Sequence, residues 1–340
     1  MSRRHNRILM AHGAGGRLTG ELISQTFLPA LKNQHLATLS DAAVLPELPP
    51  GRPALSTDAF VVDPPVFPGG DIGRLSVCGT VNDVAMGGAV PLWLTWALIL
   101  EEGTDMELVE RCTASAATAA EEAGVAIVAG DTKVVAKGSG DKIFAITAGL
   151  GVVPPGRDIG DHRIQPGDAI IASGPLGDHG AVIMAVRHQL ESETLQSDGA
   201  PVNHLVNTLY DAEIDVHALH DPTRGGLKSV ANEVAGRTNY RQILTEGLIP
   251  IRPEVSAVCE LLGLDPLGLA CEGRFLAWVP ADHVDRAVAA LREHPSGRDA
   301  SVIGRVEAGT AGAAPVILET HTGGTKPLDL LSGTDLPRIC

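Results

Sequence analysis

The chain has 340 residues, a formal net charge of −15 and a hydrophobic content of 44%, with an isoelectric point near 5.2. This excess of negative charge argues against nucleic acid or an anionic membrane surface as a partner. The length exceeds what a single core usually supports, about 250–300 residues, so two domains are expected. Five scattered cysteines without a C-x-x-C pair exclude a recognisable zinc or disulfide framework. The polar N-terminus, with no apolar run behind it, predicts a cytoplasmic protein.

A glycine-rich loop opens the chain. The run His12-Gly13-Ala14-Gly15-Gly16 precedes a stretch of helical apolar spacing at residues 18–27. Main-chain N–H groups of a glycine loop leading into a helix can hold an anion. A plain flexible loop explains the same residues, and the sequence leaves both interpretations open.

Two strand-like segments follow, and each carries an acid at its centre. Residues 39–45 contain Asp41, and the β-prone run 54–62 contains Asp58. A carboxylate in a buried strand is costly unless it is paired or bound to a cation. These positions therefore indicate a cation or a strong hydrogen-bond donor nearby.

The rest of the first half alternates helices and strands. Residues 72–86 read as a helix with Asp83 near its C-terminal end, where an acid opposes the helix dipole and suggests a positively charged ligand. Further expected elements are a strand at 91–100, a helix at 104–123, a strand at 125–129 followed by Gly130-Asp131-Thr132-Lys133, and a strand at 143–153. This order lacks regular β-α-β crossovers. It predicts an α+β or barrel-like first domain over residues 1–156.

A second domain is expected over residues 165–310. Its notable sites are the run Asp221-Pro222-Thr223-Arg224-Gly225-Gly226, which opens a helix, and Glu272, which lies in a turn between apolar strands expected at 269–271 and 274–279. Glu272 is either a surface ion pair or a partly buried general base. Residues 320–340 read as a flexible tail ending in Cys340, which is either a stray terminal thiol or a functional one.

The acidic residues in loops and strands suggest one shared site. Magnesium prefers oxygen ligands and commonly bridges carboxylates to nucleotide phosphates. The candidate ligands are Asp41, Asp58, Asp83 and Asp221, with Lys133 and Arg224 available for phosphate oxygens. Because the chain has no G-x-x-x-x-G-K-[ST] motif, a P-loop enzyme is excluded.

Several motifs together resemble the HypE family of hydrogenase maturation proteins, the carbamoyl dehydratases. The motifs are Ser40-Asp41-Ala42-Ala43-Val44, Ser56-Thr57-Asp58, Phe67 to Met86, Gly130 to Lys133, Asp221 to Gly226 and the terminal Pro337-Arg338-Ile339-Cys340. That family belongs to the ATP-binding superfamily of aminoimidazole ribonucleotide synthetase and selenophosphate synthetase. The resemblance extends from His12 to Cys340.

The resemblance implies a two-domain synthetase-like α+β fold. The N-terminal domains of a homodimer would pair into a β-barrel with ATP sites near the interface, and the C-terminal domain would be an α/β sandwich. It also implies that Cys340 receives a carbamoyl group from the HypF carbamoyltransferase. ATP-dependent dehydration then yields a thiocyanate, and cyanide passes to iron on the HypC–HypD complex.

By family position, the site residues divide into three groups. Asp41, Asp58, Asp83 and Asp221 would bind Mg²⁺, and the loop of His12, Gly13, Gly15 and Gly16 would bind ATP phosphates together with Asp83, Asp131, Lys133 and Arg224. Cys340, Glu272 and Lys133 would be catalytic, with Glu272 as the base.

Two other functions remain compatible with the sequence. One is an ATP-dependent enzyme of the same superfamily that acts on a free small molecule. The other is a nucleotide-binding assembly scaffold whose tail is only a docking peptide.

Overall fold

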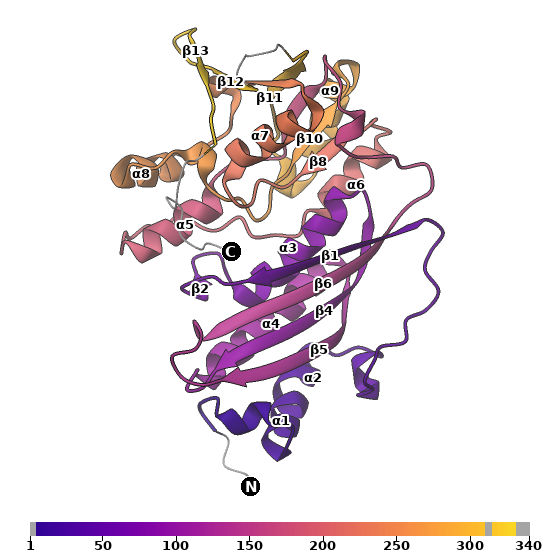
Figure 1. The fold of residues 1–340 in the computed structure, drawn as a ribbon, viewed down its shortest axis with the longest axis vertical. Helices are drawn as coiled ribbons and strands as arrows, with labels where there is room; N and C mark the ends of the chain where they lie inside the picture. The colour runs from indigo at the N-terminus through magenta and orange to yellow at the C-terminus, as the bar shows by residue number, and fades with distance from the viewer. Residues whose placement is uncertain (1–4, 310–314, 331–340) are drawn as a thin grey trace.

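The protein is a mixed α/β structure built around two sheets, shown in Figure 1. This computed structural model describes residues 5–309 and 315–330. The terminal Cys340 and the motif before it lie outside the described residues. Among the helices that are described, none has the length and apolar character needed to cross a membrane.

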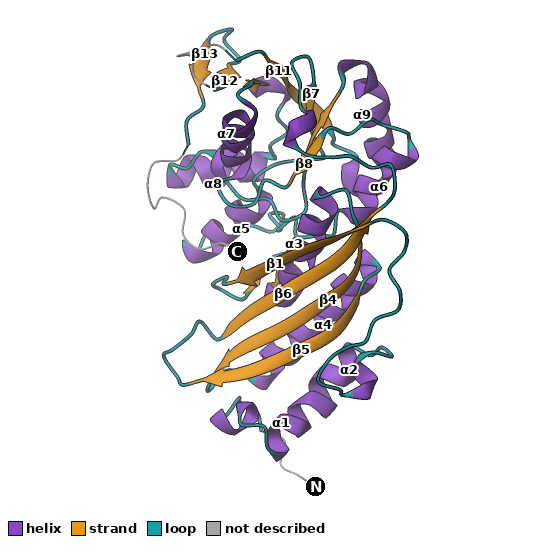
Figure 2. Ribbon diagram, turned by 45° about the vertical axis from the view of Figure 1, so that its right-hand side comes forward, coloured by secondary structure: helices purple, strands orange, loops and turns teal. Residues whose placement is uncertain are grey.

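The first sheet has four strands in the order β1-β6-β4-β5. Its strands are β1 (Arg52–Phe60), β4 (Val90–Glu101), β5 (Ala126–Val135) and β6 (Ile143–Val153). β4 and β5 are parallel, and the other neighbours are antiparallel. Helices α3 (Ile72–Met86) and α4 (Met106–Ala123) cover one face, as Figure 2 shows.

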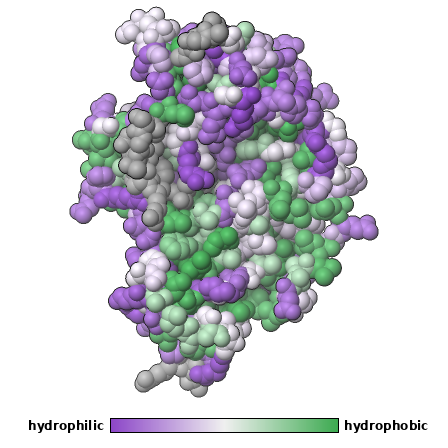
Figure 3. Space-filling model, in the orientation of Figure 1, coloured by the Kyte–Doolittle hydropathy of each residue, from purple (hydrophilic) through white to green (hydrophobic). Residues whose placement is uncertain are grey.

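The opposite face of this sheet, here called the open face, carries no helix among the described residues. The strand period of two sends alternate side chains to this face, and many of them are apolar. They include Leu55, Ala59, Ala97, Ile99, Phe144 and Ile146. Leu55 is 76% exposed, and hydrophobic side chains gather over the sheet in Figure 3. Such a patch indicates a contact surface.

The α3–α4 layer depends on close helix packing. Asp71 caps α3 by accepting hydrogen bonds from the main-chain N–H groups of Gly73 and Arg74 at 2.9 and 3.1 Å. A Cβ atom on Gly73 would lie 1.9 Å from the carbonyl oxygen of Cys112 on α4, so only glycine permits this approach. Most of α3 is buried on all sides, because α6 (Asn203–Asp211) and β8 (Ala218–His220) of the second half also contact it.

The second sheet has seven strands in the order β13-β12-β9-β11-β7-β10-β8. They are β7 (Ala169–Ala172), β8 (Ala218–His220), β9 (Arg241–Thr245), β10 (Leu276–Val279), β11 (Ser301–Glu307), β12 (Val316–Glu319) and β13 (Thr325–Pro327). Helix α7 (Gly226–Thr238) packs on one face, whereas α6 (Asn203–Asp211) and α9 (Val284–Glu293) pack on the other. Alternate strand residues such as Ile170 and Ile171 enter these two cores. Helices α5 (Asp178–Arg187) and α8 (Pro253–Leu262) lie side by side.

Most of the predicted elements exist, but four predictions were wrong, one of them the strand at residues 269–271, which has no strand conformation. Residues 39–45 form no strand, and Leu39 has a left-handed backbone with φ of 49°. Gly130 to Lys133 lie inside β5 rather than after it. Within the segment expected to be a tail, residues 325–327 pair with β12, so this part belongs to the second sheet.

Candidate active site

Four carboxyl groups from both halves of the chain form an acidic cluster. Asp58 lies on β1, Asp83 in the last turn of α3, Asp221 directly after β8, and Glu272 in the turn before β10. Burial raises the pKa of Glu272, and the negative charges of Asp198 and of the three aspartates raise it further. The structure therefore brings together four residues that are separated by up to 214 positions in sequence.

The first half positions its two aspartates through strand alternation and hydroxyl donors. Ser56 and Asp58 lie on the face of β1 that packs against α3. The Ser56 hydroxyl donates to Asp83 Oδ2 at 2.7 Å, and the Thr80 hydroxyl donates to Asp58 Oδ2 at 3.2 Å. Each carboxylate thus has one fixed neutral donor, which leaves other lone pairs for a ligand.

Glu272 is buried, with only 2% of its surface exposed, which excludes the surface ion pair that the sequence allowed. Its Oε1 has no hydrogen-bond partner among the described residues. Its Oε2 lies 3.9 Å from where a Cβ on Gly79 would stand, so the side chain faces α3 at a position without a side chain. Burial raises the pKa of Glu272 well above its usual range, and neighbouring carboxylates add to the effect.

Burial and neighbouring charges also raise the pKa values of two of the aspartates. Burial raises the pKa of Asp221 to about 7, and the charges of Asp83 and Asp58 contribute. Burial also raises the pKa of Asp83 to about 6, while Arg224 acts in the opposite direction. A cluster of this kind favours bound positive charge, because a cation restores the ionised form of each acid.

A second group of predicted residues lies at the edge strand β5. Asp131 and Lys133 pair with Ala97 and Ile99 in register, which places both on the open face. The Lys133 Nζ atom lies 2.6 Å from Asp131 Oδ2, and both side chains are exposed. The hydrogen bond from Lys133 lowers the pKa of Asp131.

The glycine loop packs against the same strand. A Cβ on Gly13 would lie 2.7 Å from the main-chain nitrogen of Val134, and Gly15 has φ of +77°, whereas Gly16 has space around it. His12 is buried, and its Nδ1 accepts a hydrogen bond from the Leu9 N–H at 2.9 Å. Burial lowers the pKa of His12, which favours the neutral form of its ring.

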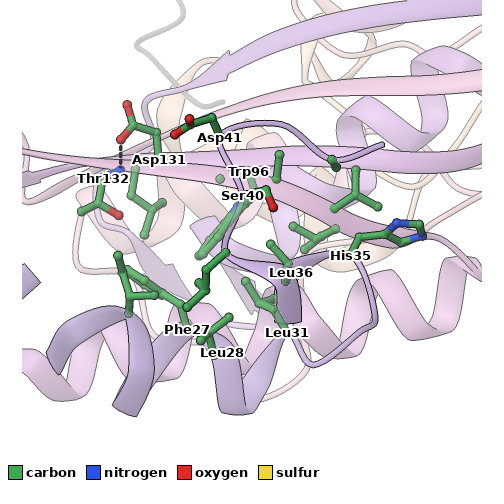
Figure 4. A pocket seen from close by; sticks show the side chains of 18 of the residues that line it. Phe27, Leu28, Leu31, His35, Leu36, Ser40, Asp41, Trp96, Asp131 and Thr132 are labelled. Atoms are coloured by element: carbon green, nitrogen blue, oxygen red, sulfur yellow. Dashed lines mark hydrogen bonds between the residues drawn. The ribbon is translucent and has the colours of Figure 1, made fainter. Parts of the chain in front are cut away.

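Between this N-terminal segment and β5 lies a cavity of about 250 Å³. Its apolar lining includes Phe27, Leu31, Leu36 and Trp96. Asp41 and Asp131 lie at one end of the cavity (Figure 4). A mostly apolar pocket with a few polar groups at its rim is the usual form of a small-molecule site.

The two groups lie on opposite edges of the four-stranded sheet. β6 and β4 separate β1 from β5, and three strand intervals of about 4.8 Å amount to roughly 14 Å. Asp41, predicted to share a site with three other aspartates, lies with the β5 group instead. In the described part of the chain, no three His, Cys, Asp or Glu side chains are close enough together to hold a metal ion on their own.

Three polar residues near the turn at residues 271–274 were not predicted from the sequence. Asp178 is 1% exposed, and neither of its carboxylate oxygens has a hydrogen-bond partner among the described residues. Burial and the charge of Asp198 raise its pKa to about 7. Asp198 and Asn82 contact the backbone of Glu272. Asp198 stands in a polar loop without a motif, so no local signal identified it.

Comparisons with known proteins cover nearly the whole chain. The family described as AIR synthase related protein, N-terminal domain, matches residues 39–153, and the corresponding C-terminal domain matches residues 165–317. Carbamoyl dehydratase HypE of Rhodobacter capsulatus is 46% identical over 346 residues, spanning 100% of both chains.

Solved structures agree with this similarity. A crystal structure of hydrogenase maturation protein HypE in complex with ATP has a TM-score of 0.93 at 46% identity and covers 98% of this chain and 99% of its own. A HypE–HypF complex has a TM-score of 0.79 at 41% identity, covering 91% and 99%. Thiamine-monophosphate kinase of Stenotrophomonas maltophilia, at 23% identity and a TM-score of 0.70, shares the fold.

Proposed function

The chain belongs to the HypE family of carbamoyl dehydratases, and we propose that it dehydrates a carbamoyl group carried on Cys340 to a thiocyanate at the expense of ATP. The observation that carries this proposal is the buried Glu272 carboxyl, which is close enough to three aspartates to be affected by their charges and has one oxygen without a hydrogen bond among the described residues. A relative with 46% identity was crystallised with ATP. The proposal assigns ATP to this chain on that similarity.

The chemistry requires an activated oxygen and a base. The amide oxygen of the carbamoyl group is a poor leaving group, so it first attacks the γ-phosphorus of ATP and releases ADP. The bond from carbon to the phosphorylated oxygen then breaks, while the nitrogen gives up its protons and the carbon–nitrogen triple bond forms. The net change removes one oxygen and two hydrogens from the carbamoyl group and converts ATP to ADP and phosphate.

Glu272 is the proposed acceptor of a proton from the nitrogen. Its burial excludes water, which would hydrolyse the phosphorylated intermediate. In the isolated subunit its raised pKa favours the protonated acid. Positive charge brought close to the cluster lowers that pKa and restores the base.

Magnesium fits the acidic cluster as a nucleotide-bridging ion. Asp83 and Asp221 have pKa values raised to about 6 and about 7, so the site favours a cation. Because Mg²⁺ takes part of its ligands from nucleotide phosphates, these acids need not form a complete set of ligands by themselves. Asp58, Asp83 and Asp221 would hold the ion, which neutralises developing charge during phosphoryl transfer. Asp41 would contribute from the β5 group, and Arg224 would contact phosphate.

A homodimer would unite the two groups. Two four-stranded sheets that pack by their apolar open faces bury exposed residues such as Leu55 and satisfy edges β1 and β5. If the sheets close into a barrel, β5 of one subunit lies beside β1 of the other. Asp131, Lys133 and the glycine loop of one subunit would then meet the acidic cluster of the second, and the cavity beside Asp41 would take the nucleoside.

The partners follow from the same proposal. HypF, which a relative binds in a solved complex, would carbamoylate Cys340, and a HypC–HypD complex would accept cyanide for the iron of a [NiFe]-hydrogenase. The first domain would span residues 1–156, and the second would span residues 165–310 together with the strands at 316–319 and 325–327, which pair with the second sheet.

The experiment measures ADP release from the full chain with HypF, carbamoyl phosphate, Mg²⁺ and ATP. Wild type is expected to release ADP in proportion to carbamoylated protein, and Cys340→Ala to release only the background amount. Equal ADP release by Cys340→Ala would instead support a kinase acting on a free small molecule.

A further inference from the structure

The segment 195–202, here called the strap, connects α5 to α6 and runs back across the first half of the chain. The Ser197 N–H donates to the Pro68 carbonyl oxygen at 2.9 Å, and Arg74 Nε donates to the Gly199 carbonyl oxygen at 2.7 Å. A Cβ on Gly69 would lie 2.7 Å from the Ser197 nitrogen. The strap is therefore held against the loop at Pro68 and Gly69 and against Arg74 in the first turn of α3.

Asp198 is the strap residue that contacts the candidate base. Its Oδ1 accepts a hydrogen bond from the Glu272 N–H at 3.1 Å, and its Oδ2 accepts one from the Gly273 N–H at 3.2 Å. A Cβ on Gly273 would lie 1.9 Å from the Asp198 carbonyl oxygen. One carboxylate thus holds two successive amides of the turn, and glycine at the second position allows the strap to approach.

Asn82 joins the same turn to α3. Its Nδ2 donates to the carbonyl oxygens of Glu272 and Ala200, both at 3.1 Å, and its Oδ1 accepts from the Val202 N–H at 2.8 Å. Asn82 directly precedes Asp83 and is 1% exposed. The turn is consequently fixed on both sides of the Glu272 peptide, by Asp198 at the nitrogen and by Asn82 at the carbonyl.

We propose that Asp198 is a positioning residue. By holding the Glu272–Gly273 turn in place, it directs the Glu272 carboxyl toward the three aspartates of the acidic cluster. This inference rests on the proposed role of Glu272 as the base. Asp198 touches the backbone of that residue and not the reacting atoms. Among the described residues no hydrogen bond reaches Glu272 Oε1, so the fixed backbone of the turn contributes to the direction of the side chain.

The test compares two variants of Asp198 with a matched control. Asp198→Ala removes both acceptors, and Asp198→Asn keeps one acceptor oxygen. Asp71→Asn is the control, because Asp71, which is buried, also accepts hydrogen bonds from two main-chain amides, at the start of α3. Each full-length protein is carbamoylated with HypF and carbamoyl phosphate, and water loss is followed in a single turnover after Mg²⁺ and ATP are added.

A misdirected base should cost about 10²-fold in the dehydration rate of Asp198→Ala, with the KM for ATP within about twofold of wild type. Asp198→Asn should recover about tenfold of that loss. Asp71→Asn should keep the wild-type rate once corrected for folded protein. If Asp198→Ala dehydrates as fast as Asp71→Asn, or if asparagine recovers nothing, the positioning role is wrong.

If wild type itself loses no water, the proposed function fails and not the clamp alone. Should Asp198→Ala not fold, Asp198→Asn decides the question, since a rate equal to wild type contradicts the inference and a drop at constant KM supports it.

Discussion

Replacing Asp221 by asparagine should stabilise the protein in a way that grows with pH. The folded pKa of Asp221 is raised from 3.8 to about 7, so folding favours its neutral form. Its contribution to stability is fully present below about pH 4 and is lost as the pH rises through 7. The difference between the folded and unfolded pKa of Asp221 corresponds to a loss of about 4 kcal/mol in the free energy of unfolding at high pH. Asparagine, which has no charge at any pH, should avoid that loss.

The assay is urea unfolding of wild type and Asp221→Asn between pH 4 and pH 8, followed by circular dichroism. The variant should match wild type at pH 4 and exceed it by about 4 kcal/mol at pH 8. The control is Asp285→Asn on the exposed side of α9, which should change the free energy of unfolding by no more than about 0.5 kcal/mol at either pH. Mg²⁺ with ATP should narrow the gap at pH 8, because a bound cation favours ionised Asp221. A gap that does not change with pH would refute the electrostatic account of the cluster.

Three further predictions concern the β5 group, the open face and the clamp. Lys133→Ala should change the free energy of unfolding by less than about 1 kcal/mol, because its ion pair with Asp131 is exposed. The same variant should raise the KM for ATP about tenfold, because it removes a charge that contacts phosphate. If the KM measured by ADP release does not change, Lys133 does not bind phosphate. Leu55→Asp should convert a dimer to monomers, as measured by light scattering, whereas Leu261→Asp, at a site 73% exposed on α8, should leave the dimer intact. If both variants have the same oligomeric state, the open face is not the dimer interface. Gly273→Ala should lower the free energy of unfolding by about 1–3 kcal/mol, because the alanine Cβ would overlap the Asp198 carbonyl oxygen. Thermal unfolding measures this loss, and an unchanged melting temperature would contradict the close approach of Asp198 to Gly273.

The local elements of the fold were largely predictable, because their signals are local. The helix at Ile72–Met86 and the strand at Ile143–Val153 match the sequence prediction in full. The strand predicted at residues 39–45 was wrong, because its mostly apolar sequence resembles a strand although no neighbouring strand pairs with it. Residues 325–327 were missed as a strand because their polar, glycine-flanked sequence gains its order from pairing with β12.

The candidate site was only partly predictable, because strand order is not written in the sequence. Asp58 and Asp83 were grouped by residue type, and the structure places them together through β1 and α3. Asp41 was grouped with them by the same reasoning, but it lines the cavity at the opposite edge of the sheet. Asp198 acts through backbone amides 74 and 75 positions away, and a loop aspartate without a motif carries no signal of that contact.

The central claim is that Cys340 carries the group on which ATP acts, and the mass of the C-terminal peptide tests it most directly. The full chain is incubated with HypF and carbamoyl phosphate, and then with Mg²⁺ and ATP, before proteolysis and mass spectrometry. The account predicts a carbamoylated Cys340 peptide that loses the mass of one water when ATP is added, and no such loss in Glu272→Gln. A carbamoylated wild-type peptide whose mass does not change on adding ATP would contradict the account.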